Sequence, residues 1–117
     1  MRTIAELLAL RCRPLGREAA QAPAQVAAQL AALPQWRQAD GAIARTYRFA
    51  DYFATIAFVN ALALMAQRED HHPELVVGYD RCEVRYSTHS AGGITDNDFV
   101  CAAKADAIFG QHLGAGR

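Results

Sequence analysis

The sequence predicts one α+β domain in which a four-stranded antiparallel sheet is covered on one face by helices. Two segments alternate apolar and polar residues around a turn signal, which is typical of β-hairpins. Each hairpin is followed by a segment with apolar residues at helical spacing. The chain has 117 residues, 52% of them hydrophobic, which suits one buried core. We therefore expect a two-layer domain over residues 1–117 with β-β-α-β-β-α order and an additional N-terminal helix.

Charge and cysteine content narrow the classes of function. Twelve basic residues balance twelve acidic ones, so no overall field favours nucleic acid or anionic lipid as a partner. Three cysteines without close spacing predict free thiols rather than a disulfide framework. No apolar run reaches the roughly 18 residues of a membrane span, and the short run at 4–10 contains Glu6 and lacks a cleavage site. We expect a cytoplasmic protein that binds neither membranes nor nucleic acid.

The N-terminal segment contains two helical patterns. Thr3 and Glu6 can form a capping box for a short helix, which Pro14 ends. We expect residues 1–20 to be a peripheral, loosely docked segment. Pro23 then begins a second helix whose narrow apolar stripe is Val26, Leu30 and Leu33, with Pro34 as its stop.

Residues 36–49 predict the first hairpin, because Asp40-Gly41 is a strong two-residue turn signal. Arg45 falls on the apolar face of the second strand and can either stack on Trp36 or reach solvent at a sheet edge. The apolar residues of that face are Ile43, Tyr47 and Phe49.

Asp51 is a candidate N-cap for a long helix over residues 52–70. This helix has two apolar stripes, so it is either central to the fold or meets another subunit. One stripe contains Phe53, Ile56, Ala57, Asn60 and Leu64, and the other contains Phe58, Leu62 and Met65.

The second hairpin brings histidines together in the predicted register. An Asp80-Arg81 turn would place the alternating apolar residues of both strands on one face: Leu75, Val77, Tyr79, Cys82, Val84 and Tyr86. Counting outward from that turn sets His72 opposite His89, within the roughly 4.5–5.5 Å that separates paired Cβ atoms. We therefore expect two imidazoles to meet at the open end of the hairpin.

The last helix is predicted to begin after a flexible loop over residues 90–93. Thr95 fits its N-cap and Asp98 the position that bonds back to the cap. This gives Asp98 a structural role as well as a candidate functional one. We expect the helix to end near Phe109 and His112 to be solvated.

Three histidines in one stretch favour acid–base chemistry, because imidazole titrates near neutral pH. A zinc site built from His71, His72 and His89 is conceivable, but the adjacent pair would point in different directions, so we expect no metal. The run from Ser87 through Thr88 to His89 is not a catalytic triad, since neighbouring residues cannot supply that geometry.

The spacing of His71-His72-Pro73, Tyr79, His89 and Asp98 resembles the signature of the pterin-4a-carbinolamine dehydratases. The likeness runs from Leu33-Pro34-x-Trp36 to Ile108, which is most of the chain. The sequence departs from the family at Gln67, where an acidic residue is usual.

The resemblance implies loss of water from 4a-hydroxytetrahydropterin to give quinonoid dihydropterin, which recycles the cofactor of aromatic amino acid hydroxylases. It implies that His71 and His89 act as the acid–base pair while His72 positions the pterin. It also implies a homodimer or homotetramer and no cofactor beyond the pterin substrate. The residues expected to support the site or bind substrate are Gln67, Asp70, Pro73, Glu74, Ser87, Thr88 and Asp98. The alternative is a weakly active or non-catalytic module for pterin or protein binding, with Gln67 as the mark of a degraded site.

Overall fold

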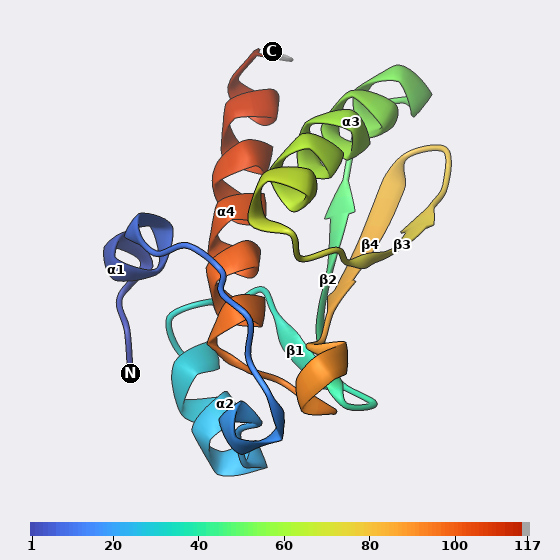
Figure 1. Cartoon of the computed structure of the whole chain (residues 1–117). Coiled ribbons are helices and arrows are strands. Elements are labelled where there is room, and N and C mark those ends of the chain that lie inside the picture. The colour runs from blue at the N-terminus through green and yellow to red at the C-terminus, as the bar shows by residue number, and fades with distance from the viewer. Residues whose placement is uncertain (116–117) are drawn as a thin grey trace.

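The computed structural model describes the backbone of residues 1–115 and the side chains of residues 1–111. Figure 1 shows the elements in chain order, with the two hairpins each followed by a long helix. Their bounds are α1 Ile4–Ala9, the 3-10 helix η1 Arg17–Ala19, α2 Pro23–Leu30, β1 Arg37–Ala39, β2 Ala42–Arg48, α3 Tyr52–Glu69, β3 Glu74–Val77, β4 Arg81–Tyr86, the 3-10 helix η2 His89–Ala91 and α4 Asp96–Ala115. Among the described residues, no helix is both long and apolar enough to cross a membrane.

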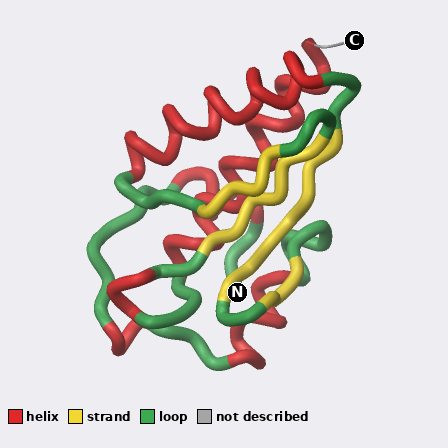
Figure 2. Tube along the Cα trace, turned by 90° about the vertical axis from the view of Figure 1, so that its right-hand side faces the viewer, coloured by secondary structure: helices red, strands yellow, loops and turns green. Residues whose placement is uncertain are grey.

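The four strands form one antiparallel sheet in the order β1-β2-β4-β3. The long helices lie together on one side of it, as the turned view in Figure 2 shows. This confirms the predicted α+β class and two-layer arrangement. The strand order puts β2 and β4 in the centre, so the strand that leads to His89 is fixed by neighbours on both sides.

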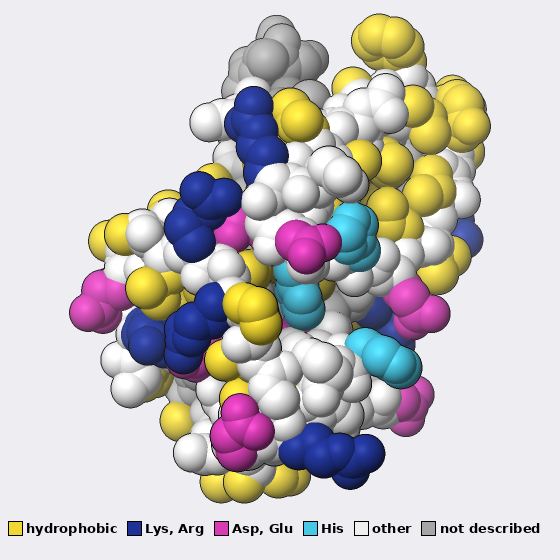
Figure 3. Space-filling view, in the orientation of Figure 1, with side chains coloured by type: hydrophobic (Ala, Val, Ile, Leu, Met, Phe, Trp, Pro, Cys, Tyr) yellow, Lys and Arg dark blue, Asp and Glu magenta, His cyan; other side chains and the backbone are white. Residues whose placement is uncertain are grey.

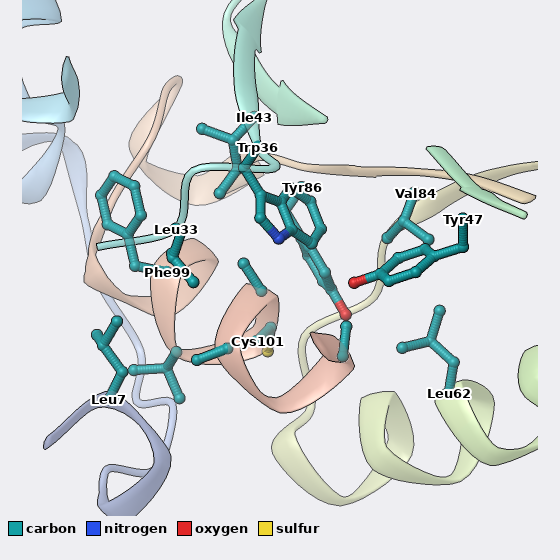
Figure 4. Close-up of a cluster of buried hydrophobic side chains, with 14 of the residues drawn as sticks. Leu7, Leu33, Trp36, Ile43, Tyr47, Leu62, Val84, Tyr86, Phe99 and Cys101 are labelled. Atoms are coloured by element: carbon teal, nitrogen blue, oxygen red, sulfur yellow. The ribbon is translucent and has the colours of Figure 1, made fainter. Parts of the chain in front are cut away.

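The core lies between the sheet and the helices. Tyr47, Val84 and Tyr86 extend from the central strands towards Leu62 of α3 and towards α4 (Figure 4). Tyr47 also packs against Phe58 of α3, with 4.7 Å between ring centroids, and all five residues are at most 1% exposed. Burial of side chains of this size contributes about 1.5–3 kcal/mol each. The core therefore fixes how α3 and α4 lie relative to β4.

The predicted first hairpin is confirmed, with Ala39 paired to Ala42 around Asp40-Gly41. Arg45 takes neither of its two predicted positions. Its guanidinium lies 4.3 Å from the ring centroid of Tyr47 and donates to Asp106 of α4 at 2.7 Å. The same carboxylate accepts from the indole N–H of Trp36 and the hydroxyl of Tyr47, so this polar cluster ties α4 to the sheet.

The second hairpin has the predicted alternation but a different register. Leu75 pairs with Val84 rather than Tyr86, because the turn residues are Tyr79 and Asp80. Two hydrogen bonds from other elements hold that turn. The carbonyl of Tyr79 accepts from the hydroxyl of Thr55 on α3, and the carbonyl of Asp80 accepts from the N–H of Phe49, the residue after β2. A local turn signal carries no information about these partners.

The predicted pairing of His72 with His89 is therefore wrong. β3 begins only at Glu74, after Pro73, which has no N–H to donate to the ladder. Beyond β4 the chain bends, and Thr88 forms an isolated bridge with Gly93. The segment expected as a flexible loop contains the 3-10 helix η2 instead, and His89 is its first residue.

Helix starts follow the sequence closely. The capping box of Thr3 and Glu6 and the Asp51 cap of α3 are both present. At the start of α4, the carboxylate of Asp98 accepts from the Thr95 N–H as predicted. This helix runs past Phe109 to residue 115, and the His112 side chain lies outside the described residues.

The N-terminal segment is anchored rather than loosely docked, which corrects the expectation for residues 1–20. Leu7 of α1 is fully buried in the core beside α4. The chain after α1 runs along α4 and the end of α3 (Figure 1). Buried polar side chains from both helices bind its backbone, which no local pattern could indicate.

Candidate active site

His71 is positioned by the turn that ends α3. Asp70 follows Glu69 in the left-handed conformation, with φ 52°, and the His71 N–H closes the turn on the Ala66 carbonyl at 3.2 Å. The imidazole then lies parallel to the ring of Tyr86, with 5.7 Å between centroids and 7° between planes. Burial raises the pKa of the Tyr86 phenol well above its ordinary value, so this platform stays neutral.

Asp98 holds the other edge of the imidazole. Its Oδ1 lies 2.6 Å from His71 Nε2, while its Oδ2 accepts from the Thr88 hydroxyl and the Thr95 N–H, each at 2.9 Å. The carboxylate is fully buried. An ionised carboxylate only accepts hydrogen bonds, so this contact assigns a proton to Nε2. Among the described residues, the second ring nitrogen of His71 has no hydrogen-bond partner.

A pocket of about 400 Å³ opens beside this imidazole. That volume is within the roughly 300–1,000 Å³ range of small-molecule sites. Its walls come from the end of α3, the β4–η2 connection, the start of α4 and the N-terminal segment. The lining residues are Cys12, Arg13, Pro14, Leu15, Glu69, Asp70, His71, Thr88, His89, Ser90 and Asn97. The space-filling view in Figure 3 shows histidine side chains gathered near the centre of this face.

The structure brings together some of the predicted site residues. His71, His89, Asp70 and Thr88 line the pocket, and Asp98 lies behind His71. Asp98 therefore supports His71 as well as the predicted start of α4.

The other predicted site residues lie outside the pocket lining. His72 is exposed, with its Nε2 at a long 3.5 Å from the Gln67 side-chain oxygen. Glu74 is on the sheet face away from the helices, 3.9 Å from the Arg85 guanidinium. Pro73 is half-buried and Ser87 is exposed.

Sequence reasoning missed the residues supplied by the N-terminal segment and the residues that hold it. Glu69 is 5% exposed at its side chain and binds Arg11, Lys104 and the Cys12 N–H. Burial alone would raise the pKa of Glu69, but the Cys12 N–H and the two cations outweigh it and hold that pKa below its ordinary value of 4.5. The carboxylate thus stays charged at neutral pH. In the sequence, this role of Glu69 is indicated only by an acidic residue at the end of a predicted helix.

The arrangement can perform proton transfer without a metal being invoked. One imidazole is fixed by a buried carboxylate and a second borders the same small pocket, which is the geometry of general acid–base catalysis. In the described part of the chain, no group of three or more His, Cys, Asp or Glu residues is placed to hold a metal ion. Fold and site together define a small α+β protein with a histidine-lined pocket.

Comparison with known proteins gives the family. The family model "Pterin 4 alpha carbinolamine dehydratase" matches residues 19–108, and the chain belongs to that family. Two similar relatives are both named "Putative pterin-4-alpha-carbinolamine dehydratase". The one from Xanthomonas campestris pv. campestris (strain B100) is 57% identical over 79% of this chain and 80% of its own. The one from Stenotrophomonas maltophilia (strain K279a) is 49% identical over 95% of this chain and 98% of its own.

Solved structures agree with this assignment. A transcriptional coactivator/pterin dehydratase from Brucella melitensis has a TM-score of 0.73 and 35% identity, covering 76% of this chain and 97% of its own. A pterin dehydratase-like protein identified as a RuBisCO assembly factor in the alpha-carboxysome has a TM-score of 0.57 and 24% identity, covering 65% and 90%. The second likeness shows the fold alone.

The contact between Thr88 and Asp98 gives a stability prediction. Thr88→Val keeps the side-chain shape but removes the hydroxyl that donates to Oδ2 of the buried carboxylate. We expect a loss of roughly 1–3 kcal/mol in the free energy of unfolding, measured by urea denaturation. Ser87→Ala, at the exposed neighbouring position, is the control and should change it by less than about 0.5 kcal/mol. Equal effects of the two substitutions would contradict the role given to Thr88.

Proposed function

We propose that the protein is a 4a-hydroxytetrahydropterin dehydratase, a hydro-lyase in which histidines carry the proton transfers. The observation that carries the proposal is that His71 and His89 border one small pocket while a buried carboxylate fixes His71. The family assignment supports a pterin as the substrate.

The proposed reaction needs two proton transfers. One proton goes to the hydroxyl on C4a as the C–O bond breaks and water leaves. Another leaves the adjacent ring nitrogen, whose N–H electrons form the new C=N bond of the quinonoid dihydropterin. Carbon and nitrogen are neither oxidised nor reduced by an external agent, so the step needs no redox cofactor. Each positioned acid or base commonly contributes about 10²–10⁴-fold.

We assign these transfers to His71 and His89 as a pair. His71 has one nitrogen bound to Asp98, which leaves its second nitrogen for substrate. Asp98 acts through His71 by fixing the ring and its tautomer, so it is a positioning residue. His72 is exposed beside His71 and is proposed to contact the pterin at the pocket rim. Asp70 and Thr88 are the supporting residues within the lining.

The histidine roles predict distinct kinetic effects. We expect His71→Gln and His89→Gln each to lower kcat by about 10²–10⁴-fold, because each removes one proton-transfer group. We expect His72→Gln mainly to raise KM, because it removes a contact that binds substrate before and during the reaction equally. Stopped-flow assay of carbinolamine dehydration measures both constants. A correctly folded wild-type protein no faster than buffer would contradict the proposed function.

The product of this reaction is an oxidised pterin that must be reduced before reuse. We therefore place the protein in tetrahydrobiopterin-type recycling, with a pterin-dependent hydroxylase, such as an aromatic amino acid hydroxylase, as the class of enzyme that supplies its substrate. The protein would act there on a released small molecule, so no stable complex with the hydroxylase is required.

A second candidate is a binding module with weak or no dehydratase activity. Two observations favour it: Gln67 in place of an acidic residue, and a cluster of exposed apolar side chains on α3 and the second hairpin. The Brucella melitensis relative is also named a transcriptional coactivator, which supports considering an interaction role here.

Gln67→Glu separates the two candidates. Gln67 is exposed, and among the described residues its side chain contacts His72, outside the pocket lining. For a working enzyme that tolerates glutamine, we expect kcat within about a factor of ten of the wild type, less than one acid–base group contributes. A rise of 10²-fold or more in the dehydration assay would instead indicate a degraded site restored by a carboxylate. Gln67→Asn is the control, because it changes side-chain length without adding charge.

We also propose that the protein forms a homodimer or homotetramer through the exposed apolar side chains. Phe53 is 83% exposed and Leu64 55% on α3, while Val77 on the edge strand β3, on the sheet face that the helices cover, is 41% exposed. Tyr52 and Tyr79 stack on each other next to them and are themselves exposed. Figure 3 shows apolar side chains gathered over this part of the molecule. Exposed apolar side chains gathered in this way usually mark a protein interface.

The oligomer proposal predicts a change in mass on charging this surface. We expect Phe53→Glu to shift the protein towards monomer in sedimentation velocity, because association would bury an unpaired carboxylate. Glu6→Gln, on the exposed side of α1, is the control and should leave the distribution unchanged. A wild type that is monomeric at all concentrations would contradict the proposal.

A further inference from the structure

Residues 11–15 form an N-terminal strap that borders the histidine pocket and lies outside the region matched by the family model, residues 19–108. The family assignment therefore gives the strap no role. In Figure 1 the strap descends from α1 in front of α4, and its last residue, Leu15, contacts Ser90 of η2. Because it lies beside His71 and His89, the strap is placed to contact a molecule bound in the pocket.

The backbone of the strap is held at three of its five residues. The Cys12 N–H donates to Glu69 Oε1 at 2.8 Å, and the Leu15 carbonyl accepts from the Ser90 hydroxyl at 2.6 Å. Between them, the Asn97 side chain accepts from the Arg13 N–H at 3.2 Å and donates to the Arg13 carbonyl at 2.6 Å.

Two of these partners are buried, because Glu69 is 8% exposed and Asn97 is 5% exposed. Without the strap, their polar atoms would lose hydrogen bonds in a buried setting, which is costly. The strap is therefore a fixed wall of the pocket. Its anchoring carboxylate, Glu69, has a lowered pKa, so this contact persists at neutral pH and weakens only as pH falls below the ordinary value of 4.5.

Arg13 supplies this wall with a cationic side chain. Its backbone is fixed by Asn97, yet among the described residues its guanidinium has no hydrogen-bond or ion-pair partner. The neighbouring Arg11 differs, because it is bound to Glu69 at 2.9 Å. Arg13 is exposed and lines the pocket, so it is available to a bound molecule. Asp70 also lines this pocket but lies beyond ion-pairing distance of Arg13.

We propose that the strap is a specificity element of the pocket, in which Arg13 binds an anionic substituent of the pterin substrate. This inference rests on the proposed function and adds the class of substrate. A guanidinium can donate two parallel hydrogen bonds to a carboxylate or a phosphate, and such charge-assisted bonds are stronger than neutral ones. The uncharged bicyclic ring would lie between the histidines, with its charged substituent towards the strap.

Binding of stable oxidised pterins tests this without depending on catalysis. The probes are uncharged 6-hydroxymethylpterin, 6-carboxypterin and the phosphate ester of 6-hydroxymethylpterin, titrated by calorimetry at low and moderate salt. We expect the wild type to bind one or both anionic probes roughly tenfold more tightly than the neutral one. The two anionic probes distinguish a carboxylate from a phosphate as the preferred group.

Arg13→Gln should remove that preference and leave the affinity for the neutral probe unchanged. Arg17→Gln is the matched control, because Arg17 is an exposed arginine at the start of η1, just after the strap, that does not line the pocket. Equal affinity of the wild type for neutral and anionic probes would overturn the inference, as would equal weakening of all probes by Arg13→Gln. Absence of binding by every probe would overturn it as well, and the dehydration assay on the same preparation then decides whether the proposed function also fails.

Discussion

The candidate site depends on one buried carboxylate, whose partners among the described residues include an imidazole, a hydroxyl and a backbone N–H. Asp98 is fully buried, and its compensation comes from His71, Thr88 and the backbone of Thr95. A buried charge that loses its partner commonly destabilises a protein by about 3–5 kcal/mol. These contacts therefore fix three segments relative to one another: the end of α3, the connection after β4 and the start of α4. The imidazole is placed in the pocket by the same contacts that keep the helices in position.

The packing of the rest of the fold keeps the segments that contact Asp98 in fixed positions relative to one another. The sheet and the two long helices pack through Tyr47, Tyr86 and Phe58, so the end of α3 cannot slide relative to β4 without disturbing the core. Tyr86 contributes twice, as a buried core residue and as the surface on which His71 stacks. The same residue thus contributes to stability and to the geometry of the site, so substitutions in the core near Tyr86 would also change the position of His71 in the pocket.

Local sequence patterns correctly predicted the features that depend on residues close together in the chain. The caps at Thr3 and Asp51 and the Asp40-Gly41 turn each depend on residues three or four positions apart, and each is present. The register of the second hairpin depends instead on a long-range contact, in which the hydroxyl of Thr55 on α3 donates to the carbonyl of the turn residue Tyr79. The partner of Asp98 and the anchoring of the strap likewise join residues far apart in sequence. Histidine spacing could indicate a shared site, but only packing decides that His71 rather than His89 meets the carboxylate.

The central claim is that His71 and Asp98 act as one unit in the proposed reaction. A double-mutant cycle on kcat, with His71→Gln, Asp98→Asn and both together, tests it most directly, once each variant is shown to be folded at the assay temperature. If Asp98 acts through His71, the double variant should be no slower than His71→Gln alone. Losses that multiply, so that the double variant is slower by the product of the single effects, would contradict the account.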